Sequence, residues 1–270
     1  MSREAVAMGE ERSLFLKLGG SLLTDKTATE ALRGAELARL AGEIAAARAA
    51  RLGLRLVLGH GSGSFGHVAA ARHGTRAGVA GASAWLGFAA VSDAAARLNR
   101  HVVAALLAAG VPAIGLPPSA SAVVNDGHIR GLATGPVVAA LDAGLLPVVF
   151  GDVAFDTVRG GTIVSTEEVL GYLAHSLRPA WLLLAGETGG VLDAGGRVVR
   201  TAADEPEAGR TGIDVQTGHA EGMVMVPDRR RGLRVLVAEI RRPGDGIGRV
   251  RLAVVRPLHG VAGGDVVGGR

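Results

Sequence analysis

Residues Leu56–Val68 read LVLGHGSGSFGHV, and the fold prediction starts from this stretch. A short apolar run, Leu56–Leu58, leads into a glycine-rich turn, after which the residues favour a helix. A strand, a tight turn and a helix start leave backbone N–H groups that point one way, an arrangement that suits an anion such as phosphate. Gly61, Gly63 and Gly66 let a ligand approach the chain closely. Because glycine makes up 42 of the 270 residues, an ordinary strand-to-helix turn stays an equal alternative for this stretch alone.

The two histidines of this stretch have different expected roles. His60 follows the strand, and a single histidine there is more often a structural residue whose polar atoms are satisfied. His67 lies in the opening turn of the helix, where its side chain can face whatever the glycine turn binds.

A second strand-to-glycine turn lies near the N-terminus, where LFLKL at Leu14–Leu18 precedes Gly19, Gly20 and Ser21. The chain has 29 lysines and arginines, and Lys17 and Lys26 are its two lysines. A lysine carries a compact ammonium and an arginine a planar guanidinium, so the two are not interchangeable at a site. Two lysines flanking one glycine turn, in a chain that otherwise uses arginine, indicate a site that requires an ammonium group.

Strand and helix signals alternate along the following residues. Helices are expected at about 29–52, 82–109, 135–143 and 165–177, and strands at 54–58, 111–116, 145–150 and 181–185. Hairpins are expected at 122–132, turning at Asn125–Gly127, and at 153–164, turning at 159–161. Ser165, followed by Glu167 and Glu168, predicts the start of the fourth helix. This alternation predicts an α/β fold with a mostly parallel central sheet that helices cover on both faces. Ligands are then expected at the carboxyl ends of the strands, where the glycine turns gather.

Composition excludes several classes of protein. No cysteine is present, which excludes disulfides and thiolate metal sites and is compatible with a reducing, cytoplasmic location. No run is long and apolar enough to predict a membrane span. Aromatic residues are 3% of the chain and the net charge is +4, so a nucleic-acid partner is not expected. Residues 1–12 read as a loose N-terminal extension, and 13–270 as one domain.

Three motifs together carry a resemblance to a known family: KLGGSLLTDK at Lys17–Lys26, HGSGSFGH at His60–His67 and FGD at Phe150–Asp152. In this order and spacing they resemble the amino acid kinase superfamily, and within it most closely the isopentenyl phosphate kinases. The resemblance implies an open α/β/α sandwich, usually dimeric. It also implies transfer of the γ-phosphoryl group of ATP, with Mg²⁺, in line to the phosphate of isopentenyl phosphate or a related isoprenoid monophosphate.

The resemblance also implies roles for particular residues. Lys17 stabilises the transferring group and Lys26 assists it, His67 holds the acceptor phosphate, and Asp152 orients the lysines or helps to place Mg²⁺. The residues implied for ATP are Lys17, Leu18, Gly19, Gly20, Ser21, Gly63, Glu187, Gly190 and Gly222. Those implied for the acceptor are Gly61, Ser62, Gly66, His67, Phe88, Gly151, Gly161 and Thr162. The acceptor half is expected at about 13–165 and the nucleotide half at about 166–270.

Two segments of the nucleotide half depart from the family pattern. Glu187–Gly190 replaces an Asp-x-Asp-Gly run and so lacks one acidic group, and Val226 stands where a lysine is expected. Two alternatives therefore stay open beside the isoprenoid kinase. One is a kinase for another phosphonate or phosphomonoester, of the fosfomycin type. The other is a homologue that binds a phosphate ligand without transferring a group.

Overall fold

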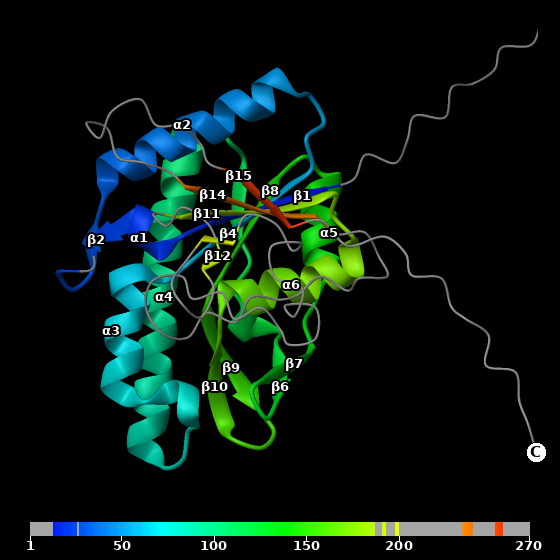
Figure 1. Ribbon diagram of the computed structural model, residues 1–270. Helices are drawn as coiled ribbons and strands as arrows, with labels where there is room; N and C mark the ends of the chain where they lie inside the picture. The colour runs from blue at the N-terminus through cyan, green and yellow to red at the C-terminus, as the bar shows by residue number, and fades with distance from the viewer. Residues whose placement is uncertain are drawn as a thin grey trace, which may run out of the picture.

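The computed structural model describes residues 13–25 and 27–186, and beyond them four short strands at 191–192, 198–199, 234–239 and 252–255. The N-terminal extension expected over residues 1–12 lies outside the described residues. Figure 1 shows a layered molecule, with a central sheet between helices and a smaller sheet extending from it.

The central sheet has seven strands in the order β15-β14-β11-β1-β4-β8-β5, and each neighbouring pair is parallel except β14 and β15. The strands are β1 (Leu14–Leu18), β4 (Leu56–His60), β5 (Ala113–Gly115), β8 (Leu146–Phe150), β11 (Trp181–Gly186), β14 (Arg234–Glu239) and β15 (Leu252–Val255). The prediction of a mostly parallel α/β sheet is therefore confirmed.

Helices cover both faces of this sheet. They are α1 (Gly20–Leu23), α2 (Gly34–Ala50), α3 (Gly63–His73), α4 (Ala82–Ala108), α5 (Gly135–Asp142) and α6 (Thr166–Leu177), with 3₁₀ turns η1 (Thr75–Ala77) and η2 (Pro118–Ala120). In Figure 1, α2 lies on one side of the sheet, and α5 and α6 lie on the other. Among the described residues, no helix is long and apolar enough to cross a membrane.

Alternation along the strands divides the core between the two faces. On β1, Phe15 packs in a cluster with α5 and α6, whereas Leu18 packs in a second cluster with α2 and the C-terminal half of α4. Side chains of a strand point alternately to opposite faces, so Lys17 shares the α6 face with Phe15. This parity decides which helix Lys17 can reach.

The smaller sheet has the order β10-β9-β6-β7, with β6 and β9 parallel and the other neighbours antiparallel. Its strands are β6 (Val123–Asn125), β7 (His128–Gly131), β9 (Asp152–Asp156) and β10 (Gly160–Val164). The expected hairpin at Asn125–Gly127 is present, and positive φ angles at Asp126 and Gly127 match the turn that such a sequence favours. Two-stranded ribbons β2 (Thr24–Asp25) with β3 (Ala31–Leu32), and β12 (Val191–Leu192) with β13 (Val198–Val199), complete the described strands.

Two expected boundaries were wrong. The helix expected from about residue 29 begins at Gly34, because the residues before it form the β2–β3 ribbon. The carboxylate of Asp25 turns that ribbon by accepting hydrogen bonds from the backbone N–H and the hydroxyl of Thr27. The second hairpin turns between β9 and β10, before Gly160, and not at residues 159–161.

Asp156 explains where the second hairpin turns. Its carboxylate is 4% exposed and accepts four backbone hydrogen bonds, from Asp126, Gly127, Val158 and Arg159, at 2.7–3.1 Å. Burial by itself would raise the pKa of Asp156, but these N–H donors outweigh it and lower the pKa to about 2. One side chain thus joins the tips of both hairpins of the smaller sheet.

We expect Asp156→Ala to lower the free energy of unfolding by about 3 kcal/mol, because four backbone N–H donors from two hairpins lose their common buried acceptor. Urea unfolding at pH 7 measures this loss. Asp142→Ala is the matched control, since Asp142 is exposed and makes a single ion pair, with Arg55, and we expect it to change stability by less than about 0.5 kcal/mol. Equal effects of the two variants would contradict the anchoring role of Asp156.

Candidate active site

The glycine turns after β1 and β4 pack directly against each other at the carboxyl edge of the central sheet. A β-carbon at position 20 would lie 2.5 Å from the backbone nitrogen of Gly63, so only glycine at position 20 permits this approach. The Gly61 N–H donates to the carbonyl of Leu18 at 3.0 Å, and the Gly19 N–H donates to the carbonyl of Ala185 at 2.7 Å. The expected gathering of these turns at one edge is confirmed.

Thr24 joins the two turns through hydrogen bonds of its side chain. Its buried hydroxyl donates to the carbonyl of Gly20 at 2.9 Å and accepts from the backbone N–H of Ser64 at 2.9 Å. The hydroxyl of Ser64 in turn accepts from the N–H of Ala31 at 3.2 Å. The turn after β1 (KLGG, Lys17–Gly20), the turn after β4 (GSGS, Gly61–Ser64) and the β2–β3 ribbon therefore form one hydrogen-bonded unit.

Lys17 lies opposite Gly59 in the register of β1 with β4. A β-carbon at position 59 would lie 2.7 Å from a methyl group of Leu170 and 2.8 Å from that of Thr166, so glycine lets the start of α6 lie directly on the sheet. Thr166 makes this contact specific, because its hydroxyl donates to the carbonyl of His60 at 2.6 Å. The same contact brings the next residue, Glu167, to Lys17.

Lys17 and Glu167 form a buried ion pair. The Lys17 Nζ lies 2.7 Å from Glu167 Oε1, and the two side chains are 10% and 14% exposed. Burial by itself would raise the pKa of Glu167, but the charge of Lys17 and its hydrogen bond outweigh burial and hold the pKa below its usual value. An ammonium group has three donors, so Lys17 keeps donors for an anion while Glu167 fixes its position.

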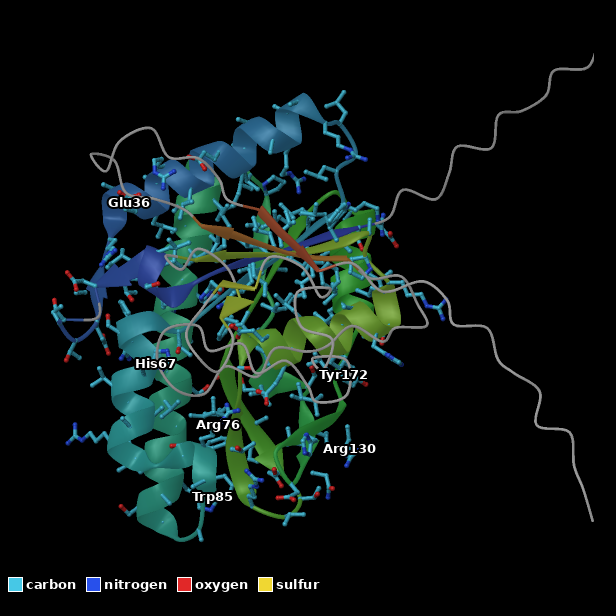
Figure 2. All side chains as sticks on the ribbon, in the orientation of Figure 1. Glu36, His67, Arg76, Trp85, Arg130 and Tyr172 are labelled. Carbon is cyan, nitrogen blue, oxygen red and sulfur yellow. The ribbon has the colours of Figure 1, made fainter. Side chains whose placement is uncertain are left out.

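His67 belongs to the same site. It lies in the second turn of α3, on an exposed position, and its electrostatic influence reaches Glu167, where it contributes to the lowered pKa. Ser62 occupies the N-cap position of α3, but its side chain makes no hydrogen bond to the first turn of that helix. Figure 2 shows His67 on the side of α3 that faces the region between α3 and α6.

Asp152 does not hold Lys17. It is 2% exposed and its carboxylate accepts hydrogen bonds from the hydroxyl of Ser92, the N–H of Ser119 and its own neighbour Val153, at 3.1, 3.3 and 2.8 Å. Burial raises the pKa of Asp152, although these donors act in the opposite direction. Glu167 is the carboxylate that pairs with Lys17, and Asp152 ties the start of β9 to α4 and η2; the expected role of Asp152 toward the lysines or Mg²⁺ stays a prediction.

His60 is a structural residue, as expected. It is fully buried, stacks on Phe150 with ring centroids 5.4 Å apart, and has hydrogen-bond partners at both ring nitrogens, Asn99 and the carbonyl of Gly61. Burial lowers its pKa, although the hydrogen bonds with Gly61 and Asn99 act in the opposite direction.

The residues implied for the acceptor tail lie between α4 and β10. Phe88 packs with Val79, Val91 and Val153 in a small apolar cluster. Gly161 lies against it, since a β-carbon there would be 2.8 Å from the Phe88 ring. Thr162 is buried and its hydroxyl donates to the carbonyl of Arg76 at 3.0 Å.

The structure thus describes Lys17, Leu18, Gly19, Gly20, Ser21, Gly61, Ser62, Gly63, Gly66, His67, Phe88, Gly151, Asp152, Gly161 and Thr162. Gly151 lies at the same edge, because a β-carbon there would be 3.4 Å from the backbone nitrogen of Thr166. The side chain of Leu18 is a core residue. Lys26, Glu187, Gly190 and Gly222 lie outside the described residues. Sequence reasoning missed Gly59 and the pairing of Glu167, and the alternation of β1 with the helix start at Ser165 was the signal that pointed to them.

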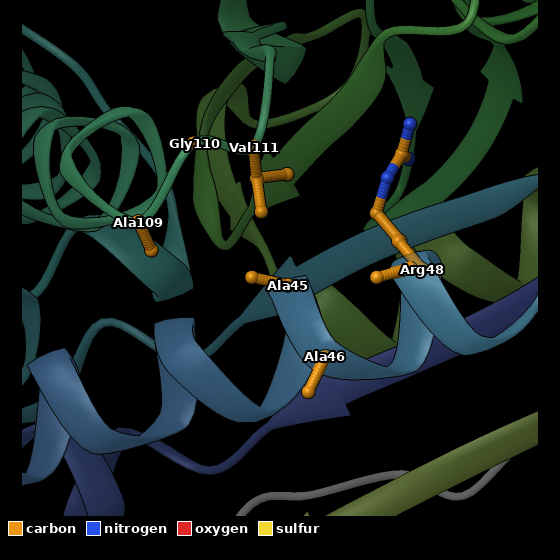
Figure 3. Close-up of a pocket in the computed structure, with 7 residues that line it drawn as sticks. Ala45, Ala46, Arg48, Ala109, Gly110 and Val111 are labelled. Carbon is orange, nitrogen blue, oxygen red and sulfur yellow. The ribbon is translucent and has the colours of Figure 1, made fainter.

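A cavity of about 540 Å³ lies elsewhere, at the amino ends of the strands, between α2 and the end of α4 (Figure 3). Its one charged lining side chain is Arg48, which donates to the carbonyl of Gly144 at 2.7 Å. The other lining residues are Ala45, Ala46, Ala49, Ala109, Gly110 and Val111. This cavity offers no reactive group, so the candidate site is the glycine-lined edge at the opposite ends of the strands.

The comparisons with known proteins agree with this geometry. Residues 13–215 match the amino acid kinase family. The chain belongs to this family. It is 39% identical over 213 residues to the isopentenyl phosphate kinase of Haloferax volcanii, covering 77% of this chain and 84% of that one. It is 32% identical over 185 residues to that of Methanothermobacter thermautotrophicus, covering 66% and 68%.

A solved isopentenyl phosphate kinase has the same fold. The two structures superpose with a TM-score of 0.69 at 26% identity, over 83% of this chain and 90% of the other. A second, described as a substrate complex, has a TM-score of 0.58 at 27% identity, over 67% and 71%. The resemblance expected from the motifs at Lys17–Lys26 and His60–His67, and the open α/β/α architecture that it implied, are confirmed.

We expect Glu167→Gln to lower the free energy of unfolding by about 3 kcal/mol at pH 7, because it leaves the buried Lys17 ammonium without its counter-charge. The lowered pKa of Glu167 means that its contribution is complete above the usual glutamate pKa of about 4.3 and is lost as the pH falls through the folded value. The difference between wild type and variant therefore shrinks in acid. Urea unfolding from pH 7 to pH 3 measures it.

Glu43→Gln is the control for this comparison, because Glu43 is 59% exposed in its ion pair with Arg39. We expect it to change stability by less than about 0.5 kcal/mol at either pH. A Glu167→Gln deficit that is small, or that stays constant down to pH 3, would show that the pair does not stabilise the fold.

Proposed function

We propose that this protein is an ATP-dependent kinase that transfers the γ-phosphoryl group to the phosphate of isopentenyl phosphate, giving isopentenyl diphosphate and ADP. The observation that carries the proposal is the Lys17–Glu167 ion pair at an edge formed by two abutting glycine turns, with His67 near enough to contribute to the lowered pKa of Glu167. In this arrangement the ammonium of Lys17 can stabilise the negative charge of the transferring phosphoryl group, and the imidazole of His67 can bind the acceptor phosphate. The similar relatives named isopentenyl phosphate kinase support the same substrate.

The residues act by positioning and by neutralising charge. In phosphoryl transfer, negative charge spreads over oxygens that pass between two partners, and little covalent chemistry is left to the protein. In the proposed reaction, an acceptor phosphate oxygen forms a bond to the γ-phosphorus as the bond to the bridging oxygen breaks, and ADP leaves. Lys17, held by Glu167, donates to the transferring group, and the backbone N–H groups of Gly20 and Ser21 lie along the ATP phosphates.

On the acceptor side, His67 donates to the acceptor phosphate together with the backbone N–H groups of Ser62 and Gly63, since the Gly61 N–H is bonded to the carbonyl of Leu18. A phosphomonoester offers more acceptor oxygens than a carboxylate, which suits a histidine beside a helix start. The apolar tail then points toward Phe88 and Gly161, where α4 meets β10. Tail length is set in this proposal by how far the Phe88 ring can move from Gly161.

Mg²⁺ enters the proposal with the nucleotide. Within the described residues, no group of three or more His, Asp and Glu side chains is arranged to hold a metal ion. Mg²⁺ commonly binds through substrate phosphates with few protein ligands, so this donor set fits an ion carried by ATP. When bound, it neutralises charge on the β- and γ-phosphates.

The family resemblance supports a homodimer, and the absence of cysteine supports action in the cytoplasm.

The test is ADP release from ATP and Mg²⁺ with isopentenyl phosphate, comparing wild type with His67→Ala. We expect kcat/KM for isopentenyl phosphate to fall by about 10²-fold, because the acceptor phosphate loses a positioned donor. His128→Ala is the control, since His128 is an exposed histidine on the β6–β7 hairpin, and it should retain wild-type turnover.

Parallel assays with geranyl phosphate and fosfomycin separate the acceptor classes. Faster turnover of fosfomycin would replace the isoprenoid acceptor with the phosphonate alternative. Binding of isopentenyl phosphate without ADP release would contradict the kinase and favour a phosphate-binding homologue.

A further inference from the structure

Arg76 connects two parts of the site that are far apart in the sequence. It lies on η1, between α3, which carries His67, and α4, which carries Phe88. Its Nη2 lies 3.4 Å from Glu168 Oε1, its Nη1 lies 3.5 Å from the carbonyl oxygen of Ile163, and its own carbonyl accepts from Thr162. The side chain and the backbone of one residue thus contact β10 and the start of α6. In Figure 2, Arg76 lies on the same side of the molecule as His67.

The two carboxylate oxygens of Glu168 have different partners. Oε2 accepts from the N–H of Ser165 at 2.5 Å, and the Ser165 hydroxyl accepts from the N–H of Glu168 at 3.1 Å, a capping box that fixes the first turn of α6. Oε1 faces Arg76. Because the cap needs only one of the two oxygens, α6 can form without Arg76. The contact with Arg76 therefore has a purpose other than starting the helix.

Charge suggests what that purpose is. Glu167 and Glu168 are consecutive carboxylates, 14% and 11% exposed, at the place where the proposed acceptor brings further negative charge. Lys17 neutralises Glu167, and the guanidinium of Arg76 lies against Glu168. A largely buried carboxylate without a cation would repel an acceptor phosphate more strongly than the same group in water.

We infer that Arg76 is a positioning residue, which neutralises Glu168 and holds η1 against the start of α6 so that the Lys17–Glu167 pair and His67 face one anionic acceptor. This inference rests on the proposed function of the site as a phosphate-acceptor kinase. Arg76 acts through Glu168 and not by touching the acceptor.

The experiment is a double-mutant cycle with Arg76→Gln and Glu168→Gln. Affinity for isopentenyl phosphate is measured by calorimetry without ATP, and kcat and KM by ADP release. Arg76→Gln should weaken acceptor binding and raise the acceptor KM by about tenfold, because an unneutralised carboxylate remains beside the phosphate. Glu168→Gln keeps an oxygen for the Ser165 N–H. It should therefore restore affinity in the double variant to within about twofold of wild type.

Controls separate this effect from unfolding. Arg76→Lys keeps the charge and should bind the acceptor nearly as wild type does. Arg55→Ala removes an arginine of similar exposure, paired with Asp142 at the opposite edge of the sheet, and should change neither affinity nor KM. Thermal melting of each variant shows that the comparison is made between folded proteins.

Wild-type affinity for the acceptor after Arg76→Gln would overturn the inference. It would also be overturned if Arg76→Gln weakened acceptor binding equally with Glu168 present and in the Glu168→Gln variant, because Arg76 would then contact the acceptor directly. Failure of the proposed function is distinguishable, because it appears as a wild-type protein that releases no ADP. In that case the double-mutant cycle is evaluated from the binding affinities alone. Inorganic phosphate is the ligand measured if isopentenyl phosphate does not bind.

Discussion

The buried ion pair between Lys17 and Glu167 is the contact on which the arrangement of the site depends. It requires three conditions at once: Lys17 on the α6 face of β1, a residue without a side chain at position 59 of β4, and a helix that begins at Thr166. Each condition comes from a different segment of the chain. Because two charges removed from water are costly when unpaired, the pair also selects the register in which all three conditions hold.

Once this register is set, the other parts of the site follow from it. Thr166 is hydrogen-bonded to the carbonyl of His60, which fixes the end of β4 and hence the GSGS turn. That turn packs on Gly20, so the donors of both glycine turns lie at one edge beside the Lys17 ammonium. The proposed binding of phosphate at this edge therefore depends on backbone packing, which also places the charged groups.

Much of this could be predicted from the sequence, because it depends on local signals. Apolar runs followed by glycine predicted strands β1, β4 and β8, the NDG turn predicted the β6–β7 hairpin, and Ser165 with Glu168 predicted the start of α6. The partner of Lys17 could not be predicted in the same way. It depends on strand register and on the face that each residue of β1 occupies, and both are set by contacts between distant segments. For the same reason the hydrogen bonds of Asp152 to Ser92 and Ser119, which lie on other elements, could not be predicted.

The smaller sheet shows how the tail side of the site is held in place without belonging to the central sheet. Its strand β9 carries a buried carboxylate at each end: Asp152 is tied to α4 and η2, and Asp156 is tied to the tips of both hairpins. With both ends fixed, β10 has little freedom to move away from α4, so the contact of Gly161 with Phe88 is set by acidic residues several residues away. In the proposed function, room for a longer acceptor tail then comes from rotation of the Phe88 side chain and not from opening of the sheet, since opening would break hydrogen bonds to two buried carboxylates.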